Sequence, residues 1–342
     1  MKLHGALAAL VLAAAAPQAA PLAVHVGGRA VAAADGSLRF GWPGVYFEGR
    51  FRGTAITVAV EAGTDHLRVL IDGQAKAVLI KPGLARLGLA GLGEGEHLVR
   101  LEKLTESQSG GSRLIGFYPA GGAMRAPPPR PHAIEFIGDS YTAGYGDTSP
   151  TRDCDRARVH DTTDTQQAFG PVLARRLDAD YRVIAYSGYG VVRNYDGAVP
   201  GDSLPARYPR AIPGDPAPAA DDGWRPQWIV VNLGTNDFST PLHPGEAWTD
   251  QAALHTAYRA RYVDFVRERI AGQPQARVIL MGSDAFYADV QAVAAAVNAH
   301  AVVPVIAVRF GPLELTGCNY HPSLKDHQAL ADLLQRTVEQ LR

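Results

Sequence analysis

Four short polar blocks between residues 138 and 323 each follow an apolar segment, and two of them carry residues suited to acyl transfer. Gly-Asp-Ser occupies residues 138–140, directly after the apolar residues 134–137, and His-Pro-Ser occupies residues 321–323. A serine hydroxyl becomes a nucleophile when a neighbouring base takes its proton, and a neutral imidazole is the commonest base. Gly-Asp-Ser is also an ordinary turn sequence, but its position after a strand makes Ser140 a candidate nucleophile, with His321 as base.

The two middle blocks supply hydrogen-bond donors. Residues 185–190 read Ala-Tyr-Ser-Gly-Tyr-Gly, and residues 230–237 read Val-Val-Asn-Leu-Gly-Thr-Asn-Asp. A glycine N–H and an asparagine amide are donors of the kind that an oxyanion hole requires. Each block alone is equally compatible with a plain turn after a strand.

The segment around His321 also predicts the start of a helix. Ser323 and Asp326 are spaced as in a capping box, with Asp in place of the usual Glu. His321 is then expected just before the last helix, where the positive end of the helix dipole disfavours an imidazolium. His327, one turn into that helix, is expected to be a surface or packing residue.

Taken in this order, the four blocks resemble those of the SGNH (GDSL-type) hydrolase superfamily. Within it, residues 138–146, 187–194, 232–239 and 317–323 resemble carbohydrate esterase family 2, and so do the N-terminal residues 40–44, 47–60, 93–104 and 116–117. The resemblance implies a β-sandwich domain followed by an α/β hydrolase domain. It also implies an enzyme that removes acetyl groups from plant-type polysaccharides.

Carried over by position, the resemblance makes Ser140 the nucleophile and His321 the base. It assigns the oxyanion hole to the N–H groups of Ser140 and Gly188 and to the side-chain amide of Asn236. We expect neither a cofactor nor a metal, because the sequence contains no Cys-x-x-Cys, His-Glu-x-x-His or phosphate-binding glycine loop.

One position departs from the commonest pattern of the superfamily, which places an Asp three residues before the His. Cys318 stands there, and Asn319, two residues before the His, is uncharged. We therefore expect a Ser–His dyad whose ring is oriented by a backbone carbonyl or by Asn319. A remote Asp, either Asp139 or Asp237, is the weaker alternative.

The two cysteines, Cys154 and Cys318, lie near the nucleophile block and the base. An even pair in an exported protein favours a disulfide, here one that joins two catalytic loops, while two unrelated buried thiols remain the alternative.

Aromatic residues beside the four blocks are candidates for sugar binding. Tyr320 stands where relatives often carry an aromatic residue that stacks on the sugar, and a core tyrosine is the alternative. Tyr141, Tyr145 and Tyr189 are similar candidates.

The wider sequence predicts the elements that position these residues. Residues 21–124 contain short apolar runs separated by glycines, with a hairpin signal at Asp72-Gly73, and predict a jelly-roll-like β-sandwich. Residues 125–131 form a proline-rich linker. Residues 132–342 alternate strands and helices, which predicts a flavodoxin-like parallel sheet with its ligand site at the carboxyl ends of the strands.

The hydrolase domain is expected to contain the following elements. The predicted strands are residues 134–137, 181–186, 228–233, 278–281 and 302–308, and the predicted helices are residues 166–177, 250–271, 290–299 and 323–341. Residues 200–223, rich in Pro, Asp and Ala, are expected to form a long loop over the ligand edge of the sheet.

Residues 1–20 predict a secretory signal peptide, because a basic start precedes a short apolar run and small residues. An Ala-rich N-terminal helix is the alternative. The apolar run is too short to span a membrane, so we expect a secreted or periplasmic protein without membrane attachment after cleavage.

Composition excludes several classes of protein. The chain has 342 residues, 33 Lys and Arg, 34 Asp and Glu, and 46% hydrophobic residues. The balanced charge disfavours a nucleic-acid partner, and the hydrophobic content excludes global disorder. The preferred function is an exported O-acetyl esterase whose partner is an acetylated carbohydrate. A lipase or thioesterase and a catalytically lapsed glycan-binding protein are the alternatives, and nothing in the sequence selects an oligomeric state.

Overall fold

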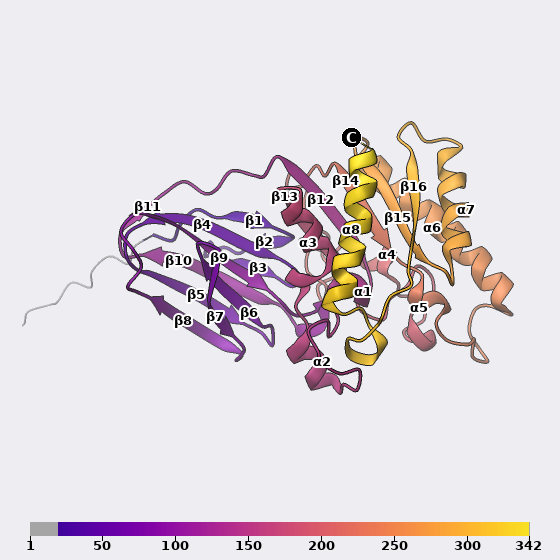
Figure 1. Cartoon of the computed structure of the whole chain (residues 1–342), viewed down its shortest axis with the longest axis horizontal. Helices are drawn as coiled ribbons and strands as arrows, with labels where there is room; N and C mark the ends of the chain where they lie inside the picture. Colours follow the sequence, from indigo (N-terminus) through magenta and orange to yellow (C-terminus); the bar gives the residue numbers. More distant parts are fainter. Residues whose placement is uncertain (1–19, 342) are drawn as a thin grey trace, which may run out of the picture.

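The computed structural model describes residues 20–341, which form two domains side by side (Figure 1). The predicted signal peptide lies, except for its last residue, outside the described residues. Within the described part of the chain, no helix has the length and apolar character needed to cross a membrane.

The N-terminal domain is a sandwich of two antiparallel sheets. One sheet has the order β1-β4-β9-β6-β7, with β11 paired to β4, and the other has the order β2-β3-β10-β5-β8. The strands are β1 (His25–Gly27), β2 (Ala30–Ala32), β3 (Leu38–Phe40), β4 (Tyr46–Arg52), β5 (Ile56–Ala62), β6 (Leu67–Ile71), β7 (Gln74–Leu79), β8 (Gly83–Leu89), β9 (Glu96–Lys103), β10 (Ser112–Pro119) and β11 (Gly122–Ala123).

Local sequence explains the hairpin between β6 and β7. Asp72 and Gly73 have φ angles of 51° and 77°, the left-handed conformation that a tight two-residue hairpin turn requires. Along β6, Leu67, Val69 and Ile71 are buried while the residues between them are half-buried. The alternation places one face of the strand in the sandwich core, as the period of a strand dictates.

A five-stranded parallel sheet forms the centre of the second domain, in the order β13-β12-β14-β15-β16. The strands are β12 (His132–Gly138), β13 (Ala179–Ala185), β14 (Trp228–Asn232), β15 (Arg277–Ser283) and β16 (Val305–Phe310). This is the flavodoxin-like order. The predicted fold class, a parallel-sheet hydrolase domain after a sheet-rich N-terminal domain, is confirmed.

Helices cover both faces of the parallel sheet (Figure 1). The α-helices are α1 (Ser140–Ala143), α2 (Arg156–Thr162), α3 (Phe169–Arg176), α4 (Leu204–Arg207), α5 (Thr235–Phe238), α6 (Gln251–Gly272), α7 (Tyr287–Asn298) and α8 (Leu324–Gln340), and short 3-10 turns are η1 (Ser107–Ser109), η2 (Thr165–Gln167), η3 (Tyr195–Gly197) and η4 (Cys318–Tyr320). In β12, Phe136 packs with α3 and α8, whereas Ile137 belongs to the core under α6 and α7.

Contrary to expectation, only the start of the segment 200–223 lies at the ligand edge, where the Leu204 N–H donates to the Gly190 carbonyl at 3.0 Å, and the rest of the segment runs away from that edge. It crosses one face of the sheet: Tyr208 is buried, donates a hydrogen bond to Glu135 of β12 at 2.8 Å, and packs edge-on against Phe265 of α6. The reason is topological, because the chain must return from the carboxyl end of β13 to the start of β14.

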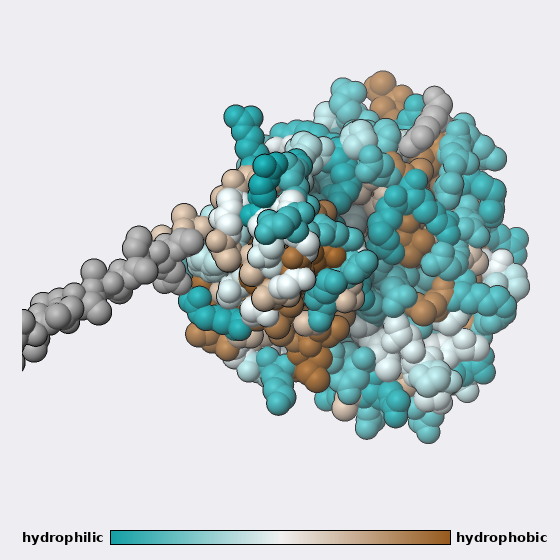
Figure 2. All heavy atoms as spheres, turned by 60° about the vertical axis from the view of Figure 1, so that its left-hand side comes forward, coloured by the Kyte–Doolittle hydropathy of each residue, from teal (hydrophilic) through white to brown (hydrophobic). Residues whose placement is uncertain are grey.

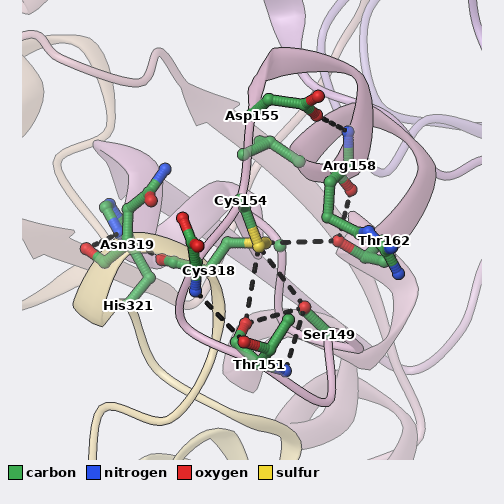
Figure 3. Close-up of a disulfide and its surroundings, with 12 residues drawn as sticks. Ser149, Thr151, Cys154, Asp155, Arg158, Thr162, Cys318, Asn319 and His321 are labelled. Carbon is green, nitrogen blue, oxygen red and sulfur yellow. Dashed lines mark hydrogen bonds between the residues drawn. A yellow bond between two sulfur atoms is a disulfide. The ribbon is translucent and has the colours of Figure 1, made fainter.

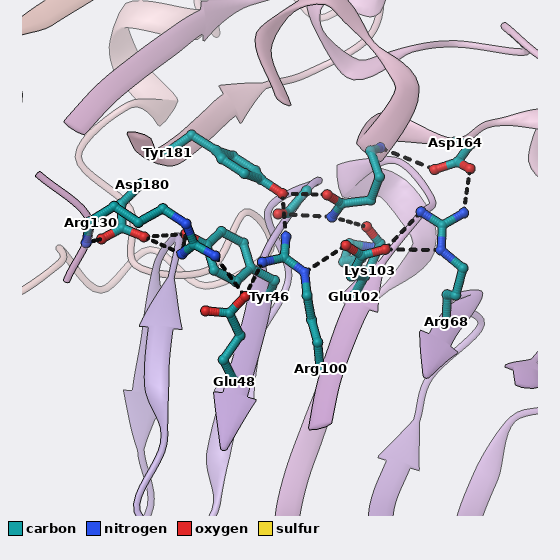
Figure 4. Close-up of polar contacts among 12 residues, drawn as sticks. Tyr46, Glu48, Arg68, Arg100, Glu102, Lys103, Arg130, Asp164, Asp180 and Tyr181 are labelled. Carbon is teal, nitrogen blue, oxygen red and sulfur yellow. Dashed lines mark hydrogen bonds and ion pairs between the residues drawn. The ribbon is translucent and has the colours of Figure 1, made fainter. Parts of the chain in front are cut away.

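The start of β13, the edge strand of the parallel sheet, meets the sandwich through a dense group of charged and phenolic side chains (Figure 4). Arg100 of β9 donates to the Tyr181 hydroxyl at 2.8 Å, and Tyr46 of β4 donates to the Asp180 carboxylate at 2.6 Å. Arg130, from the proline-rich segment, also binds Asp180 at 2.7 Å. These contacts fix one domain against the other.

On the sandwich side of the molecule, hydrophobic and neutral residues are interspersed with hydrophilic ones (Figure 2). Three of the large hydrophobic side chains that remain exposed, Val78, Ile80 and Leu84, belong to β7, β8 and the turn that joins them.

Candidate active site

Ser140 lies at the carboxyl end of β12, at the first position of α1. The preceding Gly138 is required for close approach rather than for a left-handed turn, because a Cβ there would lie 2.0 Å from Thr142 Oγ1. The Asp139 carboxylate accepts the Tyr141 N–H at 3.0 Å and so caps α1. The Ser140 side chain is thereby held at the sheet edge.

The structure brings the candidate nucleophile and base together. His321 Nε2 lies 2.9 Å from Ser140 Oγ. On the other side of the ring, Nδ1 lies 3.0 Å from the Cys318 carbonyl oxygen and 3.1 Å from the Asn319 carbonyl oxygen. Carbonyl oxygens only accept, so Nδ1 carries the proton and Nε2 is left to accept the serine proton.

A turn with unusual backbone geometry places these two carbonyls beside Nδ1 of the ring. Asn319 and Tyr320 have φ angles of 49° and 61°, the left-handed region that side chains other than glycine rarely adopt. The Asn319 N–H donates to the Arg152 carbonyl at 2.7 Å, and the Cys318 N–H donates to the Gly146 carbonyl at 3.2 Å. The loop after the nucleophile therefore holds the turn that precedes the base.

A disulfide between Cys154 and Cys318 joins the same two loops (Figure 3). The Cys318 side chain is fully buried. The bridge thus ends at the residue whose carbonyl binds the His321 ring. The alternative of two separate thiols does not describe this structure.

Asn319 orients the base through its backbone and only indirectly through its side chain. Its side-chain amide donates to the Tyr145 hydroxyl at 3.1 Å. The Tyr145 ring stacks on the His321 ring with centroids 4.1 Å apart, and Tyr141 meets that ring edge-on at 5.6 Å. Tyr141 and Tyr145 therefore pack the imidazole, a role that the sequence did not indicate.

Burial lowers the pKa of His321 below its ordinary 6.5, although its hydrogen bonds to the carbonyls of Asn319 and Cys318 act in the opposite direction. The imidazole is neutral at neutral pH, as a general base must be. The capping box is present: Ser323 and Asp326 exchange side-chain-to-backbone hydrogen bonds at the start of α8. His321 stands just before that helix, as expected.

Gly188 presents a backbone N–H at the same edge, in the loop after β13. Its φ of 84° is left-handed, and a Cβ built there would meet no atom within 4 Å, so this backbone borders open space. Among the described residues, none of the hydrogen bonds outside helices and strands uses the Gly188 N–H. The N–H of Ser140, in the first turn of α1, has no acceptor inside the helix. Both groups suit an oxyanion.

Asn236, in α5 after β14, is buried beside the nucleophile, but its amide already has acceptors. Its Nδ2 donates to the Tyr189 carbonyl at 3.0 Å and to Asp139 Oδ2 at 3.2 Å. An amide nitrogen carries two hydrogens. Asn236 can donate to an oxyanion only if its longer contact, with Asp139, gives way.

Asp139 and Asp237 do not reach the base. The Asp237 carboxylate accepts the backbone N–H groups of Val191, Val192 and Arg193 at 2.9–3.1 Å. Burial raises the pKa of Asp139 to about 7 and that of Asp237 to about 6. Both carboxylates take part in local hydrogen bonds, and among the described residues neither is hydrogen-bonded to His321.

The remaining candidates differ in exposure. Tyr320 is 67% exposed beside His321, which excludes the core alternative, and the Arg152 guanidinium lies 5.1 Å from its ring centre. Tyr189 is largely buried. His327 is fully buried and accepts the Phe169 N–H at 3.2 Å, so it joins α8 to α3, and burial lowers its pKa to about 3.

A cavity of about 760 Å³ adjoins Gly188 and lies between the two domains. Tyr145 and Tyr195 line it from the hydrolase domain, and Thr64 and Glu106 line it from the sandwich. The sequence did not indicate any sandwich residue at the site. Glu106 and Ser187 are in contact across 81 positions, a distance over which no local pattern carries a signal.

Among the described residues, no three His, Cys, Asp or Glu side chains are grouped so that they could hold a metal ion.

Two family descriptions match the chain. Residues 26–129 match the N-terminal domain of carbohydrate esterase 2, and residues 136–336 match the GDSL-like lipase/acylhydrolase family. The two matches follow the two domains of the structure.

Individual relatives agree. An acetylxylan esterase/glucomannan deacetylase of Cellvibrio japonicus is 40% identical over 99% of both chains. A solved carbohydrate esterase, described as having divergent catalytic and non-catalytic binding functions in its active site, is 41% identical with a TM-score of 0.88, over 94% of this chain and 98% of that one. A family two carbohydrate esterase from Clostridium thermocellum in complex with cellohexaose is 27% identical, with a TM-score of 0.83 and coverage of 93% and 98%.

Proposed function

The chain belongs to carbohydrate esterase family 2, and from that membership we propose that it is an exported enzyme that hydrolyses acetyl esters on xylan-type or mannan-type polysaccharides. The observation that carries the proposal is the contact between Ser140 Oγ and His321 Nε2, with Nδ1 held by two carbonyl oxygens. The full-length relative named for acetylxylan and glucomannan supports the substrate class.

The proposed reaction begins with proton transfer within the dyad. His321 Nε2 takes the Ser140 hydroxyl proton while Oγ attacks the acetyl carbonyl carbon. The Cys318 and Asn319 carbonyl dipoles face Nδ1–H and stabilise the imidazolium in place of a carboxylate. Because these dipoles carry no net charge, the ring returns its proton easily to the leaving sugar oxygen.

The tetrahedral oxyanion is proposed to lie between the N–H groups of Ser140 and Gly188, with Asn236 as a third donor once its contact with Asp139 opens. Expulsion of the sugar alcohol leaves an acetyl group on Ser140. His321 then activates water, which attacks the acetyl-enzyme, and acetate is released. Removal of one oxyanion donor typically lowers turnover by about 10²–10³.

The glycan is proposed to enter through the cavity of about 760 Å³ between the domains, which is larger than an acetyl group requires. Exposed Tyr320 stands beside the base and offers a ring face to sugar C–H groups. The polar rim and the nearby aromatic rings suit a carbohydrate better than a long acyl chain.

Export is proposed from the N-terminal signal pattern, and the disulfide supports it. Structural disulfides form and persist in oxidising compartments such as the periplasm or the extracellular space. N-terminal sequencing of the mature protein tests this part of the proposal, and an unprocessed Met1 in the active protein would contradict it.

The deciding experiment measures acetate release from acetylated xylan and acetylated glucomannan by the wild type and by Ser140→Ala. We expect release by the wild type alone, and the ratio of the two rates names the preferred glycan. Cleavage of para-nitrophenyl octanoate in preference to the acetate would favour the lipase alternative. Glycan binding by a wild type that cleaves no ester would favour the lapsed binding protein.

A further inference from the structure

Three successive sandwich residues contact the segment that leads into the proposed oxyanion hole. The Ser187 hydroxyl donates to the Glu106 carboxylate. The Ser107 hydroxyl donates to the Ala185 carbonyl at 2.7 Å, and the Gln108 amide donates to the Ser187 carbonyl at 3.0 Å. These contacts join the loop between β9 and β10 to the carboxyl end of β13.

The sandwich loop that supplies these contacts is itself firmly held. The ammonium group of Lys103, which is 1% exposed, donates to the Glu106 carbonyl at 2.9 Å and to Thr105 Oγ1 at 3.2 Å. It also forms an ion pair with the fully buried Asp65. A buried pair of this kind fixes the geometry around it, because either charge left alone would be strongly unfavourable. The backbone of Glu106 is therefore held in position within the sandwich, independently of its contact with Ser187.

The hydrolase segment needs such an anchor. Ala185 is the last residue of β13, so the chain beyond it no longer benefits from the ladder of the sheet. The Tyr186 N–H still donates to the Gly138 carbonyl at 3.1 Å, and two residues later Gly188 borders open space in a left-handed conformation. The direction of the Gly188 N–H depends on how the segment before it is held.

A direct contact between Glu106 and the reacting ester would work against catalysis. A carboxylate beside a developing oxyanion repels it, and the Ser187 hydroxyl already occupies the carboxylate. Burial raises the pKa of Glu106 above its ordinary 4.5, while the Ser187 hydrogen bond and Lys103 oppose that shift. The contact with Ser187 gives this half-buried carboxyl group a partner at the edge of the cavity.

We propose that Glu106 of the sandwich domain is a positioning residue for the acyl transfer: it holds Ser187 and thereby aims the Gly188 N–H at the oxyanion. The inference rests on the proposed function. Through Glu106, the sandwich is part of the catalytic machinery.

The test compares Glu106→Ala, Glu106→Gln, Ser187→Ala and the double alanine variant on para-nitrophenyl acetate and on an acetylated xylo-oligosaccharide. An oxyanion donor that points in the wrong direction costs less turnover than a donor that is removed altogether. We therefore expect each alanine variant to lower kcat about 10- to 100-fold with KM nearly unchanged. Because both variants break one contact, the double variant should be no slower than either single variant. The Gln variant keeps an acceptor oxygen and should stay within about threefold of wild type.

Glu94→Ala is the matched control, since Glu94 is exposed at the other end of β9, and it should match the wild type. Unchanged kcat in Glu106→Ala would overturn the inference, as would multiplying losses in the double variant. A KM effect confined to the oligosaccharide would overturn it too, since it would make Glu106 a substrate contact. If Glu106→Ala does not fold by circular dichroism, Ser187→Ala and Glu106→Gln decide. A wild type that cleaves no acetyl ester would refute the proposed function itself.

Discussion

Strand β13 touches the sandwich domain at both of its ends. At its start, Asp180 and Tyr181 meet the ion pairs and phenols of Figure 4, where Arg100 alone binds Glu48 and Glu102 at 2.6 Å each and Tyr181 at 2.8 Å. At its carboxyl end, a few hydrogen bonds join the sandwich to the segment 185–187. The next residue is Gly188, whose N–H has no partner among the described backbone contacts.

The two ends of β13 differ in how fully their polar groups are hydrogen-bonded within the protein. At the start of β13 the buried polar groups bind one another, which makes that end rigid and chemically inert. At the carboxyl end, the Ser140 hydroxyl contacts only the reactive His321 imidazole among the described hydrogen bonds, and the backbone at Gly188 borders open space, so both groups can act on a substrate. Changes at the first end should therefore alter stability, and changes at the second should alter catalysis.

The largest expected effect concerns the disulfide at the catalytic end. Replacing both Cys154 and Cys318 by Ala removes a link across 164 positions. The chain-entropy argument gives a loss of about 5 kcal/mol in the free energy of unfolding, measured by urea titration. Turnover should fall as well, because the turn that carries the His321 acceptors loses its tie.

Cys154→Ala alone is the control for this variant. It leaves the buried Cys318 side chain in place, so it separates loss of the link from loss of packing. Equal stability of the double variant and the wild type would show that the hydrogen bonds to Gly146 and Arg152 suffice.

The next effect belongs to the other end of β13. The substitution Arg100→Met removes a guanidinium group whose side chain is 13% exposed. It leaves the carboxylates of Glu48 and Glu102, both less than 7% exposed, without this partner. Breaking such a buried pair typically lowers the free energy of unfolding by about 3–5 kcal/mol. We expect kcat to stay within about twofold of wild type, because this network touches no reacting group.

Arg52→Met is the matched control, since Arg52 pairs with Glu96 on the surface of the same sheet, where both side chains are more than 40% exposed. It should leave unfolding unchanged. A large loss of kcat in Arg100→Met would show that the two ends of β13 are coupled.

Gly188→Ala should lower catalysis, whereas Arg100→Met should lower stability. A side chain at φ 84° shifts the backbone, and its methyl group enters the open site. Loss of this donor should lower kcat by about 10²–10³, or about 2.7–4 kcal/mol of transition-state stabilisation, measured on para-nitrophenyl acetate. Gly201→Ala is the control: its φ of 83° imposes the same strain, in open space and outside the dyad. Equal losses in both variants would contradict the role of Gly188.

Lowering the pH should affect activity and stability differently, because different groups titrate at the two ends of β13. Because the pKa of His321 lies below 6.5, protonation of the base should lower kcat/KM about tenfold per pH unit below that lowered value. The fold lowers the pKa of Glu48 and of Asp180 from ordinary values of 4.5 and 3.8. Their contribution to stability is present above those values and is lost only as pH falls below them.

Rates and circular dichroism recorded over one pH series test this order. Activity should disappear while the structure at the start of β13 is intact. Simultaneous loss of both signals would mean that unfolding, rather than protonation of His321, limits activity in acid.

Sequence reasoning worked where the determining contacts are local. The Asp72-Gly73 hairpin, the capping box at Ser323 and the alternation of strands and helices each depend on residues a few positions apart. The resemblance then located Ser140 and His321, which the sheet brings to one edge because parallel strands end there together.

Sequence reasoning failed or stopped where a contact spans the fold. It placed all of residues 200–223 over the ligand edge, although the strand order requires most of this segment to cross a face of the sheet. It named Asn236 as an oxyanion donor but gave no sign that its amide contacts Asp139 and the Tyr189 carbonyl. It also left open what orients the base.

The sequence by itself determined the residue types of the chemistry: a hydroxyl, an imidazole without an acidic partner, and glycines that permit exposed N–H groups. Only the tertiary structure decided that carbonyls of a left-handed turn bind Nδ1 and that Glu106 holds Ser187. The physical reason is that backbone carbonyls are present at every position. Which of them faces a ring depends on dihedral angles and on distant loops.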